Sequence, residues 1–158
     1  MTTTITAATL KVTITEELVL NGVDQGGTNE LSCPLVNEIF KRIITVPTSE
    51  VSIYATTDTV AGGSQFKSAR VQYVRLTNKD DTNFIWIIVK NSGNDEFVVT
   101  LAPGESWLSY NQDSDTGGGM NADNAAIADP TSGLADIDLV TARANTASSD
   151  LEVFIAQT

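Results

Sequence analysis

The sequence contains no histidine, and Cys33 is its only cysteine. Without histidine the chain has no histidine general base, no Ser–His–Asp triad and no histidine ligand for a metal. A single cysteine forms neither an internal disulfide nor a Cys-x-x-Cys zinc site. The composition therefore predicts a binding or structural module that is not an enzyme and has no cofactor.

Basic residues are also scarce, because nine of them face 20 acidic residues and the net charge is −11. Such a surface repels a phosphate backbone, so we expect no nucleic-acid partner. Long apolar runs are missing too. The longest run, 84–89, is far too short for a membrane helix, and the N-terminus lacks the basic and apolar regions of a secretory signal. We expect no membrane partner and synthesis in a cytoplasm.

The chain has 158 residues, which suits one domain. Threonine is interspersed with valine and isoleucine, and turn residues recur at short intervals, as in sandwiches and barrels. We predict an all-β fold, an antiparallel β-sandwich or jelly-roll-like domain over 9–158, preceded by an N-terminal arm at 1–8. The predicted strands are 8–13, 15–21, 38–46, 51–56, 70–77, 84–90, 96–101, 105–110, 136–143 and 150–157.

Three of these strands follow one another closely. The strand at 84–90 is apolar on both faces, which predicts a buried central position, and five turn-forming residues connect it to 96–101 in a hairpin. Pro103-Gly104 then fits a type II turn that leads into 105–110. We expect these three strands to form a β-meander.

Two segments leave alternatives open. In 34–46, apolar residues recur at helical spacing after Ser32 and Pro34, so a short helix is the alternative to a strand. Residues 111–135 are rich in Asp, Asn, Gly and Ala and predict a long polar loop. Within it, Asp113 and Asp115 resemble part of a calcium loop, but no closing Glu follows, and a plain acidic loop is favoured.

The candidate site residues are those of an interface. Lys67, Arg70 and Arg75 form the densest basic group, which favours structural ion pairs or an acidic partner over nucleic acid. Trp107 and Tyr110 lie on opposite faces of their strand, so at least one is expected to reach the surface, where aromatics bind sugars or anchor protein interfaces. The expected interface residues are Thr2, Thr4, Lys67, Arg70, Arg75, Trp107, Tyr110, Asp113 and Asp115.

Residues 14–22, 36–48, 71–84 and 101–106 carry a resemblance to a known group. They are similar to small virion structural proteins of tailed bacteriophages, especially cyanophage-like phages. The resemblance implies a β-rich virion subunit whose partners are the major capsid protein or other virion proteins. A capsid decoration (cement) protein, as a homotrimer, is the first expectation. The alternatives are a tail, fibre or knob component that binds host glycans and, from another class, a small carbohydrate-active enzyme with two facing carboxylates.

Overall fold

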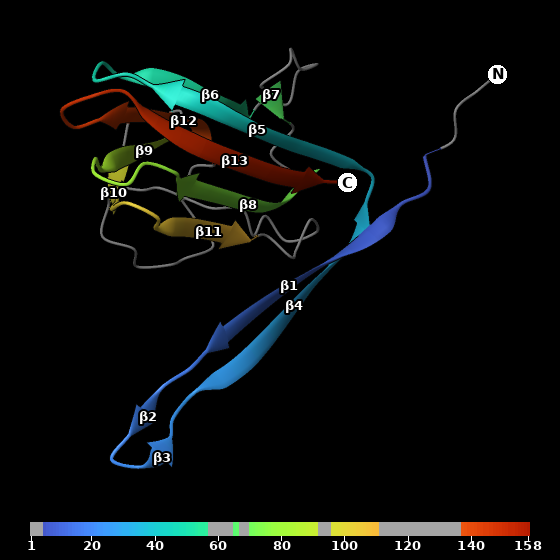
Figure 1. Cartoon of the computed structure of the whole chain (residues 1–158). Helices are drawn as coiled ribbons and strands as arrows, with labels where there is room; N and C mark the ends of the chain where they lie inside the picture. The colour runs from blue at the N-terminus through green and yellow to red at the C-terminus, as the bar shows by residue number, and fades with distance from the viewer. Residues whose placement is uncertain (1–4, 57–64, 67–69, 92–95, 111–136) are drawn as a thin grey trace, which may run out of the picture.

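The computed structural model describes residues 5–56, 65–66, 70–91, 96–110 and 137–158. Within these residues every regular element is a β-strand. Two sheets pack face to face, and a long hairpin projects from one end of the pair (Figure 1). The predicted all-β sandwich is therefore confirmed.

The sandwich is built from the part of the chain that follows the hairpin. One sheet has four strands, in the order β11 (Ser106–Tyr110), β8 (Val71–Asn78), β13 (Ser149–Gln157) and β5 (Glu38–Val46). The other has five, in the order β10 (Glu96–Leu101), β9 (Ile85–Asn91), β12 (Ile137–Ala144), β6 (Val51–Thr56) and β7 (Gln65–Phe66). All of these pairs are antiparallel except the short parallel contact of β6 with β7.

The eight longer strands of the sandwich, which are all of its strands except β7, pair in the pattern of a jelly roll. The first of them pairs with the last, β5 with β13, and the second with the seventh, β6 with β12. The third pairs with the sixth, β8 with β11, and the fourth with the fifth, β9 with β10. Such nested pairing places strands that are far apart in the chain side by side, and it defines the jelly-roll form of the sandwich.

The main core fills the space between the two sheets. On β13, Leu151, Val153 and Ile155 are buried and alternate with residues that face outward, as a strand with one covered face requires. They meet Ile87 and Val140 of the opposite sheet in one apolar cluster. Strand β9 is buried along most of its length, and its predicted non-edge position is confirmed.

The projecting hairpin consists of β1 (Ala8–Glu16) paired with β4 (Gly27–Val36) and, beyond them, β2 (Val19–Leu20) paired with β3 (Val23–Asp24). Asn21 and Gly22 form its tip, with φ angles of 52° and 78°. Positive φ at both central residues is the requirement of a type I′ turn, and Asn-Gly is the sequence that best meets it. Sandwich strands begin at β5, whereas the sequence placed their start at residue 9.

Three sequence expectations are corrected. The helix alternative at 34–46 is wrong, because β5 covers 38–46. The meander is wrong as well: β9 and β10 pair as predicted, but β11 joins β8 in the other sheet. The strand expected at 15–21 is interrupted after Glu16 and resumes only at Val19, while β4 was not predicted at all.

Two polar side chains, Asn78 and Asp80, hold the connection between β8 and β9 in place through hydrogen bonds. Asn78 is fully buried, and its side-chain amide donates to the carbonyls of Asn83 and Leu101 at 2.8 and 3.0 Å. The Asp80 carboxylate accepts the backbone N–H groups of Thr82 at 2.8 Å and Asn83 at 2.6 Å. Those N–H donors hold the pKa of Asp80 below its ordinary value.

Removing apolar bulk between the sheets should unfold the protein more readily. Ile155→Ala is expected to lower the free energy of unfolding by about 2–5 kcal/mol, because it leaves a cavity at a fully buried position. Ile39→Ala on the exposed face of β5 is the matched control and should change stability by less than about 0.5 kcal/mol. Urea denaturation measures both, and equal effects would contradict this placement of the core.

Asp80 should make the stability of the fold depend on pH in the acidic range. Its folded pKa is lowered, so its stabilising contribution is present above the unfolded pKa of about 3.9 and disappears as pH falls through the lower folded value. Asp80→Asn is expected to be less stable than the native chain at pH 7, and the two should converge below pH ~3. Thermal unfolding across pH tests this. Asp81→Asn, at the neighbouring carboxylate that accepts the Thr82 hydroxyl, is the matched control and should lower the unfolding temperature at pH 7 less than Asp80→Asn does.

Candidate assembly interface

The base of the hairpin packs on the outer face of the four-stranded sheet. Cys33 and Val36 of β4 are buried against Tyr73 of β8 and Ala156 of β13 in a second apolar cluster. Around them lie further apolar and aromatic residues of both parts, Leu10, Val12, Leu31, Tyr110 and Phe154. This contact fixes the hairpin to one end of the sandwich.

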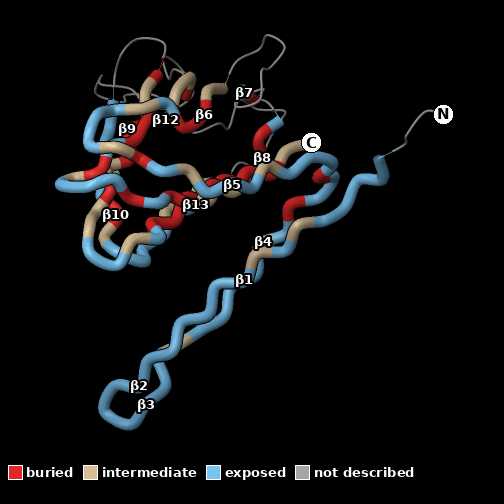
Figure 2. The backbone as a smooth tube through the Cα atoms, turned by 45° about the horizontal axis from the view of Figure 1, so that its top comes forward, coloured by how far each residue is buried: buried red, intermediate tan, exposed pale blue. Residues whose placement is uncertain are grey.

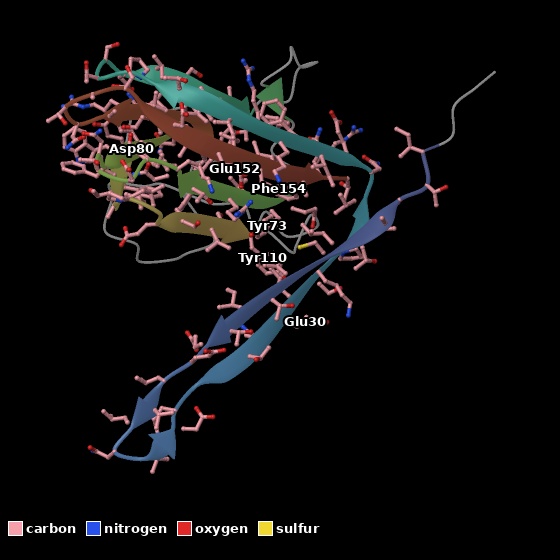
Figure 3. The ribbon with its side chains drawn as sticks, in the orientation of Figure 1. Glu30, Tyr73, Asp80, Tyr110, Glu152 and Phe154 are labelled. Carbon is pink, nitrogen blue, oxygen red and sulfur yellow. The ribbon has the colours of Figure 1, made fainter. Side chains whose placement is uncertain are left out.

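Aromatic rings form the sandwich side of that contact. The rings of Tyr73 and Phe154 meet edge to face, with centroids 5.9 Å apart, and the Arg75 guanidinium lies 5.9 Å from the Phe154 centroid (Figure 3). Burial raises the pKa values of the Cys33 thiol and the Tyr73 hydroxyl. Cys33 therefore packs as a small buried hydrophobic residue.

A bulge at the hairpin base sets the direction in which the chain leaves the sandwich. The register of β1 and β4 shifts between Ala8 and Leu10, which pair with Val36 and Cys33. Leu35 lies in the extra length of β4 and has a φ of 60°, a left-handed conformation that is unfavourable for a leucine. Asn37 alone separates β4 from β5, and its N–H donates to the Gln157 carbonyl at 3.0 Å.

Beyond the base, the hairpin has no support from the sandwich. Residues 13–30 are exposed except for Gly26, which is half-buried, and Figure 2 shows this arm as almost uniformly exposed. The Lys11 ammonium contacts the Glu30 carboxylate at 2.8 Å at the start of this stretch, but both side chains are largely solvated. We call residues 13–30 the distal hairpin.

The distal hairpin carries apolar side chains in water. Leu18, Val19, Leu20 and Val23 are 54–70% exposed, and they lie on both sides of the turn. Exposed large apolar side chains in a contiguous group mark interaction sites. The acidic residues of this segment are Glu16, Glu17, Asp24 and Glu30, and residues 13–30 contain no basic residue.

Gly26 allows the two parts of the distal hairpin to join. A Cβ at this position would lie 2.2 Å from the backbone oxygen of Glu16, so only glycine fits. Its N–H donates to the Asp24 carboxylate at 2.9 Å, and the N–H of Gln25 donates to the Leu18 carbonyl at 2.8 Å. The chain is thereby held together between β1–β4 and β2–β3, across the interruption that the sequence did not predict.

A second exposed feature is the edge formed by β5. This strand is last in the four-stranded sheet and pairs with β13 on one side. Ile39 and Ile43 are each 57% exposed on its outer face. Lys41 lies between them, 3.9 Å from the Glu152 carboxylate, and the neighbouring Arg42 is exposed.

The residues expected at an interface are distributed over several regions. Arg75 pairs with Glu152 on the outer face of the four-stranded sheet, and Arg70 is exposed at the start of β8. Trp107 packs half-buried against the main core, and Tyr110 packs against the hairpin base on the opposite face. The remaining members lie outside the described residues: Thr2, Thr4, Lys67, Asp113 and Asp115, together with the loop at 111–135.

The distal hairpin and the β5 edge were not predicted from the sequence. A signal for the hairpin was present, because Asn21-Gly22 is flanked by Leu20 and Val23, and Asn-Gly between apolar residues is a strong hairpin indicator. No comparable signal marks the β5 edge, since its position depends on which strands lie beside it.

No metal-ligating cluster of three or more Cys, Asp or Glu side chains occurs among the described residues. The part of the chain that the structure describes also has no helix that is long and apolar enough to cross a membrane.

Comparisons with known proteins give little further information. No family model matches the chain, and no curated protein matches it. A solved structure with the description "Bacillus endospore appendages form a novel family of disulfide-linked pili" is 13% identical in sequence. The match covers 76% of this chain and 82% of that chain, with a TM-score of 0.43.

The hairpin base should be loosened by removing one ring. Phe154→Ala is expected to accelerate amide hydrogen exchange in residues 10–12 and 31–36 by about tenfold, because the ring packs against this base. Exchange in β9 and β12 should stay unchanged. Leu108→Ala, an exposed position of β11, is the control and should alter neither region. Equal acceleration throughout the molecule would contradict a separate contact at the base.

Proposed function

We propose that this chain is a non-enzymatic structural subunit that is built into a larger protein assembly through its distal hairpin. The observation that carries the proposal is the exposure of Leu18, Val19, Leu20 and Val23 at the end of an unsupported arm. A two-stranded hairpin by itself is only marginally stable in water. Exposing these apolar side chains to water costs additional free energy. A partner surface that covers them would remove both costs.

The geometry of the hairpin suits a bridging role. The nine residues of β1 correspond to about 30 Å of extended chain, so the tip reaches well beyond the sandwich (Figure 1). The base contact fixes the direction of this reach, because Cys33 and Val36 are buried in it. A subunit of this form attaches to a neighbour through the arm while its sandwich keeps an independent core.

Within this proposal the assembly is a tailed-phage particle, and the chain is a capsid decoration protein. The resemblance of residues 14–22, 36–48, 71–84 and 101–106 to virion proteins supports this choice. The jelly roll is also a fold of viral capsid proteins, although it hosts lectins and other functions as well. The partner would be the major capsid protein, and a homotrimer would suit a local threefold position.

The mechanism would be mass action. A protein that binds the assembled shell and not its dissociated subunits stabilises the shell by an amount that grows with its free concentration. The distal hairpin would supply the contact, and the chain would need no chemistry beyond binding.

The expected effect of the distal hairpin can be tested by removing it cleanly. Val12 and Leu31 are direct partners across β1 and β4, so replacing residues 13–30 by Asn-Gly joins them through a two-residue turn. This tipless variant keeps every residue of the hairpin base. It should unfold at a temperature within about 3 °C of the native chain, since the removed residues belong to neither apolar cluster of the described residues.

The readout is co-sedimentation with expanded capsids, followed by cryo-EM of the decorated particle. We expect the native chain to bind the outer shell with hairpin density between subunits, and the tipless variant to bind at least tenfold more weakly. Equal binding by the two would overturn the role of the distal hairpin. Density at the tail or a fibre tip would replace the decoration role by the tail or fibre alternative.

A further inference from the structure

We propose that the distal hairpin of one copy docks along the β5 edge of a second copy, so that the chain assembles with itself. This inference rests on the proposed function and refines it: a second copy, instead of the capsid protein, would be the direct partner of the arm, and the resulting homo-oligomer would bind the shell. The contact would be a strand addition, in which a free edge of the hairpin extends the four-stranded sheet beyond β5.

The β5 edge is suited to receive a strand. It is nine residues long, and its pairing with β13 leaves the other side of its backbone unpaired among the described residues. Ile39 and Ile43 add an exposed apolar row on the outer face. An exposed edge of this length and character is a template for pairing with another chain.

The charges of the two surfaces are complementary. The distal hairpin has four acidic residues and no basic residue, while β5 carries the adjacent bases Lys41 and Arg42 in a chain that has only nine basic residues. Arg42 forms no ion pair with any residue that the structure describes. The Lys41 side chain is exposed and lies 3.9 Å from the Glu152 carboxylate, which pairs more closely with Arg75, so the Lys41 ammonium remains accessible to another carboxylate.

The apolar side chains match as well. Ile39 and Ile43 lie on one face of β5 with Lys41 between them, so the edge presents an apolar–basic–apolar row. The distal hairpin presents Leu18, Val19 and Leu20 directly after Glu16 and Glu17. Docking would bury apolar side chains of both surfaces and place the carboxylates of Glu16 and Glu17 beside the basic residues of β5.

The occupant of a given β5 edge must be another copy rather than the same one. The hairpin base is fixed on the outer face of the sheet, and Asn37 alone connects β4 to β5. In Figures 1 and 2 the tip lies at the far end of the arm, away from the sandwich, so it does not reach its own β5. Donor and acceptor are different surfaces, and such a contact produces a ring or a filament.

The first test traps the contact between two copies of the full chain. A chain with Val19→Cys is mixed with one carrying Ile43→Cys under mild oxidation, and disulfide-linked dimers are counted by mass spectrometry. We expect the mixed pair to cross-link at least tenfold more than a pair of Val19→Cys with Leu108→Cys. Leu108 is the matched control, because it is exposed on β11, at the opposite edge of the same sheet. Equal cross-linking of both pairs would overturn the inference.

The second test exchanges the charges. Glu17→Lys in the donor and Arg42→Glu in the acceptor should each weaken self-association by about tenfold in analytical ultracentrifugation. A mixture of these two variants should recover it, because each tip then meets an edge of opposite charge. Weakening without recovery in the mixture would contradict the pairing of these two surfaces.

Failure of this inference differs from failure of the proposed function. If the purified chain stays monomeric at about 1 mM and forms no Val19–Ile43 cross-link, while the tipless variant still loses capsid binding, the hairpin docks on a different protein. In that result the second copy is excluded and the proposed function stands. If the tipless variant also binds capsids normally, the proposed function fails as well.

Discussion

The apolar contact between the hairpin base and the four-stranded sheet determines what this molecule presents to its surroundings. Cys33 and Val36 are buried there against Tyr73 and Ala156, outside the space between the two sheets. Because this cluster covers only one end of the outer face, the hairpin leaves the sandwich instead of lying across it. Without the cluster, the jelly roll would keep its core but would present no directed arm.

Strands with their own local signal were predictable from the sequence. The bounds of 38–46, 51–56 and 96–101 agree with β5, β6 and β10, because each of these segments is rich in β-branched residues. Strand β4 lacks such a signal. It contains Gly27 and Pro34, residue types that are depleted in strands, and most of it is exposed on both faces, so no alternation of apolar and polar residues marks it.

Topology was harder to predict than the strands themselves. Pro103-Gly104 correctly indicates a turn after β10, and Gly104 has a φ of 77°. A turn motif indicates that the chain reverses direction, but it does not indicate which sheet the next strand joins. The meander failed for that reason. The same limit applies to the β5 edge, because the sequence of β5 does not show that it is the last strand of its sheet among the described residues, with Ile39 and Ile43 exposed on its outer face. The distal hairpin, by contrast, has a local sequence signal in the turn Asn21-Gly22, and predicting it required only that a second strand after this turn be paired with β1.

The arm also resolves a conflict that the composition creates. A net charge of −11 makes copies of this chain repel one another, which opposes any close packing of their sandwiches. That repulsion is screened beyond a Debye length of about 8 Å at physiological ionic strength. In the proposed assembly, a contact at the end of an arm of about 30 Å would keep the acidic bodies several Debye lengths apart while the tip docks. High solubility before assembly and firm attachment afterwards would then be compatible, because most of the acidic residues lie on the bodies and the apolar side chains act at the tip.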